Sequence, residues 1–246
     1  MLQRGRRPGR RTIATDTPVT IELDAARSVS GLLHAPPDAA AGFVMAHGAG
    51  AGMTHPFMAA VADGLSARRI ATLRYQFPYM QAGSKRPDRP ALAHATVRAA
   101  VAAAHRLLPA LPLFAGGKSF GARMTSQAQS EAPLPHVRGL IFLGFPLHPA
   151  KQPSDARAAH LAEVDIPMLF LQGTRDALAD TGLLVPLTGR LGAALHLVEQ
   201  ADHSFHVPVR SGRTDAQVLE ALCDTITGWT AAVLAPAGSP PRTARP

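Results

Sequence analysis

Residues 114–123 read FAGGKSFGAR and give the clearest indication of the fold in this sequence. It contains a G-x-S-x-G pattern, in which Gly117 and Gly121 lie two positions on either side of Ser119. An apolar run typical of a strand precedes the pattern, and a run compatible with a helix follows it. On a sharp turn between strand and helix the serine backbone is strained, small neighbours let the two elements approach, and the hydroxyl projects from the carboxyl edge of the sheet. The stretch therefore predicts a reactive serine at a sheet edge.

A phosphate-binding loop is the competing interpretation, because Gly117, Lys118 and Ser119 also match the end of that motif. The motif requires a further glycine five residues before Gly117, where this chain has Pro112. The residues between them are an apolar strand and not a loop whose free N–H groups could surround a phosphate. We therefore exclude a phosphate-binding loop.

The sequence on both sides of this stretch alternates between strand-like and helix-like segments. Strands are expected at residues 19–23, 29–34, 42–47, 70–74, 113–115, 137–143, 168–172 and 195–198, and helices at 57–68, 90–108, 120–130 and 215–234. The first two strands are typical of an antiparallel pair. The alternation predicts an α/β fold with a mostly parallel sheet of about seven to eight strands, covered by helices on both faces.

The composition excludes several classes of protein. The chain has 246 residues, 46% hydrophobic and 17% charged, and can bury a sizeable core. No stretch reaches the roughly 18 to 20 apolar residues that a membrane helix needs, so no membrane partner is expected. The single cysteine, Cys223, excludes an internal disulfide framework, and we expect it to pack inside the fold. No apolar segment follows the arginine-rich start, which argues against a signal peptide and for a cytoplasmic location.

The net charge of +8 is concentrated at the two ends of the chain. Residues 1–11 hold five arginines and residues 236–246 hold two, and neither segment contains an acid. Without these seven, 18 of the 25 basic residues remain against 17 acidic ones, so a nucleic acid partner is not expected. We expect a disordered extension at residues 1–17, one α/β domain at 18–235 and a flexible tail at 236–246.

A serine hydroxyl becomes a nucleophile only when a base removes its proton and an acid orients that base. In a fold of this kind the partners follow in the order serine, acid, histidine. Asp176 comes after the strand at 168–172 and is the expected acid, with Asp180 as the alternative. His203 comes after the last strand and is the expected base, with His206 as the alternative.

Two backbone N–H groups are needed to stabilise the oxyanion of a tetrahedral intermediate. One is expected from Phe120, directly after Ser119, and the second from Ala49, with Gly50 as the alternative, in the glycine-rich loop that follows the third strand. We expect His47 to order this loop. Candidates for the walls of a substrate pocket, each of which could equally be ordinary core, are Met53, Phe57, Tyr79, Met80, Phe145, Leu147 and Phe205.

These segments together resemble an α/β-hydrolase of the dienelactone-hydrolase-like kind. More narrowly, they are similar to the hydrolase-like domains named after a testis-expressed protein and the third subunit of the NSL chromatin complex. The resemblance is carried by residues 47–53, 77–80, 87–88, 116–123, 173–176 and 202–205. It implies that Ser119, Asp176 and His203 form a catalytic triad.

The sequence thus predicts a serine hydrolase that cleaves a small ester or thioester through an acyl-enzyme. Residues 145–165 are the whole connection between two late strands, too short for a helical lid domain, so we expect an open site for a small acyl substrate. No metal or organic cofactor is implied. The alternative is a non-catalytic binding or scaffold protein on a hydrolase fold. The acyl group, the leaving group, the oligomeric state and a possible acyltransferase or perhydrolase activity are left open.

Overall fold

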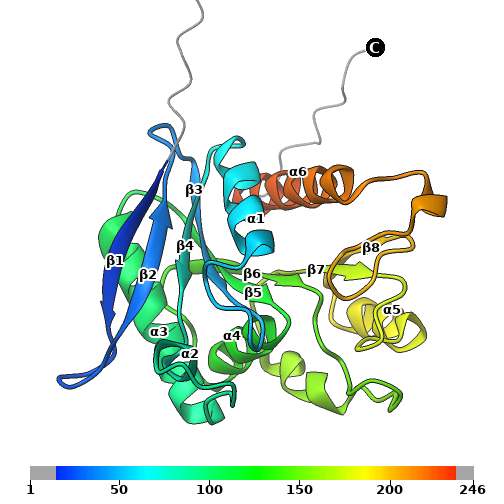
Figure 1. The fold of residues 1–246 in the computed structure, drawn as a ribbon, viewed down its shortest axis with the longest axis horizontal. Helices are drawn as coiled ribbons and strands as arrows, with labels where there is room; N and C mark the ends of the chain where they lie inside the picture. The colour runs from blue at the N-terminus through cyan, green and yellow to red at the C-terminus, as the bar shows by residue number, and fades with distance from the viewer. Residues whose placement is uncertain (1–14, 237–246) are drawn as a thin grey trace, which may run out of the picture.

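The centre of the protein is an eight-stranded sheet with the order β1-β2-β4-β3-β5-β6-β7-β8 (Figure 1). The structure is a computed structural model that describes residues 15–236. β2 runs antiparallel to both β1 and β4, and all other neighbours are parallel. The strands are β1 (Asp16–Glu22), β2 (Ser28–His34), β3 (Ala41–Ala46), β4 (Ile70–Tyr75), β5 (Leu113–Lys118), β6 (Val137–Leu143), β7 (Met168–Gly173) and β8 (Ala194–Val198). The predicted α/β fold is confirmed.

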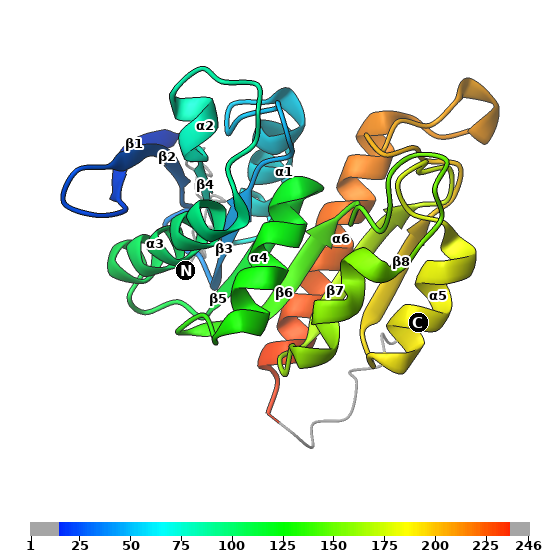
Figure 2. The ribbon, with the colours of Figure 1, turned by 90° about the horizontal axis from the view of Figure 1, so that it is seen from below.

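Helices cover both faces of this sheet (Figure 2). α1 and α6 lie side by side on one face, and α3 and α4 lie side by side on the other. The helices are α1 (Pro56–Ser66), α2 (Pro78–Gln81), α3 (Pro90–Leu107), α4 (Phe120–Glu131), α5 (Thr181–Arg190) and α6 (Asp215–Leu234), with short 3-10 segments η1 (Ala156–Glu163) and η2 (Val209–Ser211). Cys223 is fully buried in α6, as expected, and burial raises the pKa of its thiol to about 12.

The central strand β3 shows why these apolar runs form strands. All six of its residues are buried. Phe43 and Met45 belong to the core layer under α1 and α6, whereas Val44 and Ala46 belong to the layer under α3 and α4. Successive side chains of a strand point to opposite faces, so a parallel strand covered on both sides needs apolar residues at every position.

β1 begins at Asp16, three residues before the predicted start at Val19. The Asp16 carboxylate accepts a hydrogen bond from Arg74 of β4 and lies 2.9 Å from Nδ1 of His34. These contacts join residues far apart in the chain and leave no local signal. Asp16 and Thr17 therefore belong to the sheet and not to an extension at 1–17, while residues 1–14 and 237–246 of the expected tails lie outside the described residues.

Two helices were not predicted from the sequence. α5 contains Pro186 in its interior as well as Gly182 and Gly189, and these residues hide a helical pattern. α2 is a single turn that starts at Pro78. The predicted helices at 57–68, 90–108, 120–130 and 215–234 are all present, and no end differs by more than two residues from the prediction.

No cap domain lies over the carboxyl edge of the sheet within residues 15–236. The connection between β6 and β7 contains only the 3-10 segment η1. In the same part of the chain, no helix is both long enough and apolar enough to cross a lipid bilayer.

Candidate active site

Ser119 lies on the turn between β5 and α4 with φ 51° and ψ −111°, a conformation that non-glycine residues rarely adopt. The flanking glycines make this turn possible. A Cβ atom on Gly117 would lie 2.1 Å from the carbonyl oxygen of Ala46, and one on Gly121 would lie 2.6 Å from the Ala46 Cβ. Strand β3 thus packs against β5 and α4 so closely that only glycine fits, as the G-x-S-x-G pattern predicts.

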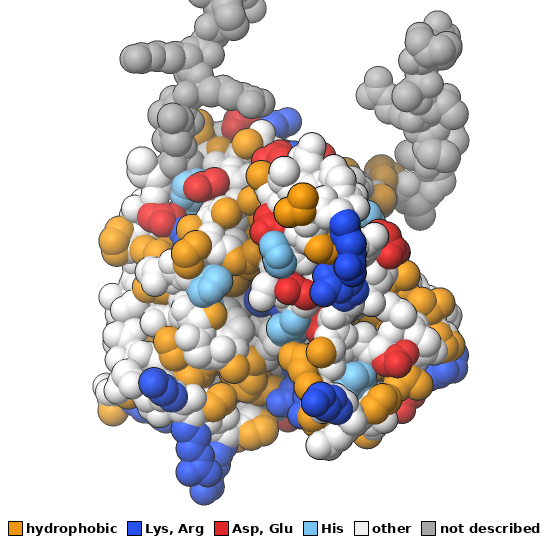
Figure 3. All heavy atoms as spheres, turned by 45° about the vertical axis from the view of Figure 1, so that its right-hand side comes forward, with side chains coloured by type: hydrophobic (Ala, Val, Ile, Leu, Met, Phe, Trp, Pro, Cys, Tyr) orange, Lys and Arg blue, Asp and Glu red, His pale blue; other side chains and the backbone are white. Residues whose placement is uncertain are grey.

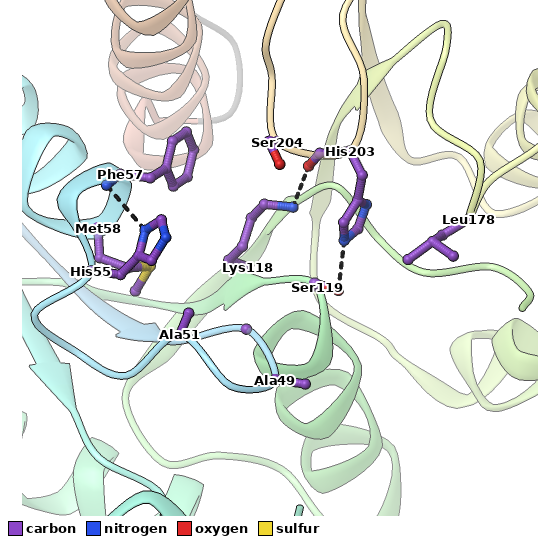
Figure 4. A pocket seen from close by; sticks show the side chains of 11 residues that line it. Ala49, Ala51, His55, Phe57, Met58, Lys118, Ser119, Leu178, His203 and Ser204 are labelled. Carbon is purple, nitrogen blue, oxygen red and sulfur yellow. Dashed lines mark hydrogen bonds between the residues drawn. The ribbon is translucent and has the colours of Figure 1, made fainter. Parts of the chain in front are cut away.

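The His203 side chain lies between Ser119 and Asp176. Its Nε2 is 2.9 Å from Ser119 Oγ (Figure 4), and its Nδ1 is 2.7 Å from Asp176 Oδ2. The Asp176 carboxylate only accepts hydrogen bonds, so Nδ1 carries the proton and Nε2 is free to accept from the hydroxyl. The Asp176 side chain is fully buried, whereas that of His203 is 28% exposed. The structure therefore brings together three residues that are 27 to 84 positions apart.

Asp176 is held by two further donors. Gln172 Nε2 lies 2.5 Å from Oδ2, and the backbone N–H of Leu178 lies 2.8 Å from Oδ1. Gln172 was not predicted from the sequence. The available signal was a polar residue inside the apolar run of β7, four positions before Asp176.

Asp180 and His206, the alternatives to Asp176 and His203, make hydrogen bonds outside this series. Asp180 precedes α5, and its Oδ1 accepts a hydrogen bond at 2.7 Å from the backbone N–H of Gly182, as a helix cap does. His206 is exposed and lies 2.9 Å from Asp215, whose carboxylate raises the pKa of the imidazole. Neither residue makes a hydrogen bond to Ser119 within the described part of the chain.

The backbone of the loop after β3 lies close to Ser119, since a Cβ atom on Gly48 would lie 3.7 Å from the Ser119 Cβ. Ala49 lines the cavity around Ser119, and the N–H of Gly50 is already bonded to the Tyr79 hydroxyl at 3.1 Å. Phe120 is the first residue of α4, where an N–H has no acceptor within its own helix. This geometry favours Phe120 and Ala49 over Gly50 as donors to an oxyanion.

The His47 ring connects this loop to the segment after β4 through two hydrogen bonds. Its Nδ1 lies 2.8 Å from the carbonyl oxygen of Gly48, and its Nε2 accepts a hydrogen bond from the Phe77 N–H at 3.1 Å. The ring is fully buried, and burial lowers its pKa, which keeps the imidazole neutral. His47 thus orders the loop, as the sequence analysis expected.

A cavity of about 370 Å³ opens beside Ser119. It is lined by Gly48, Ala49, Ala51, His55, Phe57, Met58, Lys118, Ser119, Leu178, His203 and Ser204 (Figure 4). Most of the exposed surface of the cavity is apolar, although half of its lining side chains are polar or charged, and no cap within residues 15–236 closes it. The cavity suits a small and mostly apolar group.

Most of the expected wall residues do not line this cavity. Phe57 does, and Phe205 stacks on it with ring centroids 5.7 Å apart and faces a neighbouring groove instead. The other five are not among the residues that line this cavity, because an apolar side chain near a loop can as well point into the core. They are Met53, Tyr79, Met80, Phe145 and Leu147, of which Tyr79, Phe145 and Leu147 are buried.

Lys118 is the second residue that the sequence analysis missed. It ends β5, and its Nζ donates a hydrogen bond to the carbonyl oxygen of His203 at 2.6 Å (Figure 4). Burial lowers the pKa of its ammonium group to about 8.

The potential metal ligands and the surface charge of the described part of the chain can be compared with the sequence-based expectations. Residues 15–236 contain no group of three His, Cys, Asp or Glu side chains placed to hold a metal ion. On the face shown in Figure 3, acidic and basic side chains are interspersed with hydrophobic ones.

The sheet order, the two helical layers and a hydrogen-bonded serine at the carboxyl edge define an α/β-hydrolase fold. The chain belongs to the alpha/beta hydrolase domain family, whose model matches residues 39–231.

Solved structures with the same fold include enzymes named as hydrolases. A dienelactone hydrolase from Anabaena variabilis matches with a TM-score of 0.70 and 18% identity, over 90% of this chain and 99% of that one. An α/β serine hydrolase without lid from Xanthomonas campestris matches with a TM-score of 0.67 and 18% identity, over 87% and 94%. The protein Est1E from Butyrivibrio proteoclasticus matches with a TM-score of 0.65 and 15% identity, over 87% and 99%. At these identities the likeness is one of fold.

Proposed function

We propose that this chain is a serine hydrolase that cleaves a small ester or thioester of a carboxylic acid through an acyl-enzyme. The observation that carries the proposal is the hydrogen-bonded series Ser119, His203 and Asp176, with distances of 2.9 and 2.7 Å. Both distances are within reach for proton transfer without any rearrangement.

In the proposed first half-reaction, Ser119 Oγ attacks the carbonyl carbon of the substrate while His203 Nε2 takes the hydroxyl proton. The buried Asp176 carboxylate stabilises the imidazolium that forms and keeps Nδ1 protonated. The imidazolium then gives its proton to the leaving alcohol or thiol, and the acyl group stays on Ser119. In the second half, His203 activates a water molecule that releases the acid.

The backbone N–H groups of Phe120 and Ala49 are the proposed donors to the oxyanion. Phe120 follows Ser119 at the start of α4, so the positive end of the helix dipole adds to its donor. Ala49 lies in the loop that His47 and Tyr79 fix.

The size and lining of the cavity support a small acyl substrate. A volume of about 370 Å³ without a cap favours compact or solvent-accessible groups over long chains. The printed names of the structural neighbours, a dienelactone hydrolase and a lidless serine hydrolase, agree with this class.

We further propose that the chain is cytoplasmic and does not bind nucleic acid. Within the α/β-hydrolases we propose that it is related to the testis-expressed and NSL-subunit domains.

Hydrolysis of p-nitrophenyl acetate by the full chain tests the proposed function. We expect Ser119→Ala to abolish turnover while the circular dichroism spectrum stays that of the wild type. Ser130→Ala, in the same helix α4 but remote from the site, is the matched control and should keep wild-type turnover. Undiminished hydrolysis by the Ser119→Ala variant would contradict the mechanism.

A further inference from the structure

The ammonium group of Lys118 has no role in the mechanism described above, although it lies close to the reacting side chains. Lys118 is the last residue of β5 and directly precedes Ser119 in the chain. Its Nζ reaches across to the loop after β8 and donates to the carbonyl oxygen of His203 at 2.6 Å (Figure 4). One side chain thus joins the turn that carries the serine to the turn that carries the histidine.

A second contact joins the same two turns. Lys118 Nζ lies 5.5 Å from the ring centroid of Phe205, within the range of a cation–π interaction. Phe205 adopts φ 63°, which costs energy for a bulky residue and persists only when its surroundings hold it there. The Phe205 ring also packs against Phe57, whose ring stacks on it with an interplanar angle of 9°.

The charged and titratable groups around Lys118 come from three loops. Asp176 follows β7, Asp202 and His203 follow β8, and His55 lines the same cavity from the loop before α1. The negative charges of Asp176 and Asp202 favour the ammonium form, but neither carboxylate lies within ion-pair distance of Nζ in the described residues. The His203 carbonyl and the Phe205 ring are therefore the close partners of this cation.

We propose that Lys118 is a positioning residue for His203, acting through the backbone of residues 203–205. The hydrogen bond and the cation–π contact fix the turn so that the imidazole stands between Ser119 and Asp176. This inference rests on the proposed function for its effect on turnover, but the effect on the turn itself is independent of any reaction.

The protonation state of Lys118 gives the inference a distinctive signature. Below its pKa of about 8 the group is a cation, and both contacts are at full strength. Above this pKa the charge is lost, the cation–π contact disappears and the hydrogen bond weakens. We expect turnover by the wild type to fall as the pH rises through about 8.

Lys118→Met tests the inference because methionine keeps an unbranched side chain and removes the donor and the charge. With p-nitrophenyl acetate we expect kcat to fall about 10- to 100-fold, since a displacement of about 1 Å at a reacting group has effects of this size, and KM to change little. The fall in turnover above pH 8 should disappear in Lys118→Met and be absent from Lys118→Arg, which keeps its charge. Lys85→Met, at an exposed position, is the matched control and should behave as the wild type.

Amide hydrogen exchange separates this inference from the proposed function. We expect faster exchange at Phe205 and His206 in Lys118→Met than in Lys85→Met, whether or not any ester is hydrolysed. Equal exchange rates in the two variants would overturn the positioning role. A kcat of Lys118→Met equal to that of the wild type would also overturn it. So would a turnover of Lys118→Met that falls above pH 8 as much as that of the wild type. A wild type inert toward esters would instead contradict the proposed function and leave the exchange comparison as the test of Lys118.

Discussion

Gln172 donates a hydrogen bond from Nε2 to the same oxygen of Asp176, Oδ2, that accepts from His203 Nδ1. The distances are 2.5 and 2.7 Å. Gln172 is fully buried in β7, and its Oε1 has no hydrogen-bond partner within residues 15–236. The Gln172 amide therefore donates to the Asp176 carboxylate while its own Oε1 stays without a hydrogen bond in the described residues.

This relationship predicts that Gln172→Leu separates activity from stability. Turnover should fall about tenfold, because Asp176 loses the donor that fixes its orientation. The free energy of unfolding should change by less than about 1 kcal/mol, since leucine also removes the unpaired oxygen. Steady-state kinetics and urea unfolding measure the two effects. A kcat within twofold of the wild type would show that Gln172 does not hold the carboxylate.

Tyr79→Phe removes the hydroxyl that accepts from the Gly50 N–H at 3.1 Å. The loop that presents Ala49 loses one anchor, and we expect kcat to fall about fivefold, as for a net hydrogen bond of about 1 kcal/mol. Tyr75→Phe is the matched control, because the Tyr75 hydroxyl is buried and makes no hydrogen bond to this loop within residues 15–236. Equal kcat values for the two variants would contradict the role given to Tyr79.

The pair of Asp16 and Arg74 predicts a pH-dependent stability. Burial acts to raise the pKa of the Asp16 carboxyl, but the hydrogen bonds and charges of Arg74 and His34 lower it overall, below 3.8. The pair therefore stabilises the fold above pH 3.8, and this stabilisation is lost as the pH falls through the lowered pKa.

Asp16→Asn should lower the free energy of unfolding at pH 7 by about 1–2 kcal/mol, since it leaves the buried Arg74 guanidinium without its carboxylate while solvent screens the exposed part of the pair. The difference from the wild type should shrink in urea titrations below pH 3.8. Asp38→Asn, in the exposed pair with Arg69, should cost less than about 0.5 kcal/mol. A difference between Asp16→Asn and the wild type that grows toward low pH would contradict this account.

Gly121→Ala tests the close packing behind Ser119. Its Cβ would meet the Ala46 backbone and side chain at 2.6 Å, so we expect a loss of about 3 kcal/mol or more in the free energy of unfolding. Gly189→Ala, in α5, has open space around the new Cβ and should be neutral or stabilising. Thermal unfolding compares them, and similar melting temperatures would contradict the packing argument.

The sequence predicted the sheet, the serine turn and the order of the three side chains because these depend on local patterns. An apolar run that ends in GKSFG predicts both a strand and the turn after it. Asp176 and His203 each follow another apolar run that is typical of a strand. Parallel strands end at the same edge, so residues after those ends converge. The start of β1 at Asp16 was missed because its partner Arg74 is 58 residues away.

The supporting residues were harder to predict. Lys118 and Gln172 stand out only as polar residues in apolar strands, and the sequence does not show which group each side chain contacts. The pocket walls depend on which of many apolar side chains turns toward the cavity, and of the seven candidates Phe57 alone lines it. These relationships become visible only when distant segments are placed side by side.

Reaction of the full chain with a fluorophosphonate is the most direct measurement of the central claim. We expect one covalent adduct per chain, located by mass spectrometry in the tryptic peptide of residues 119–123, and none in Ser119→Ala. Absence of an adduct on the folded wild-type protein, or equal labelling of Ser119→Ala, would contradict it.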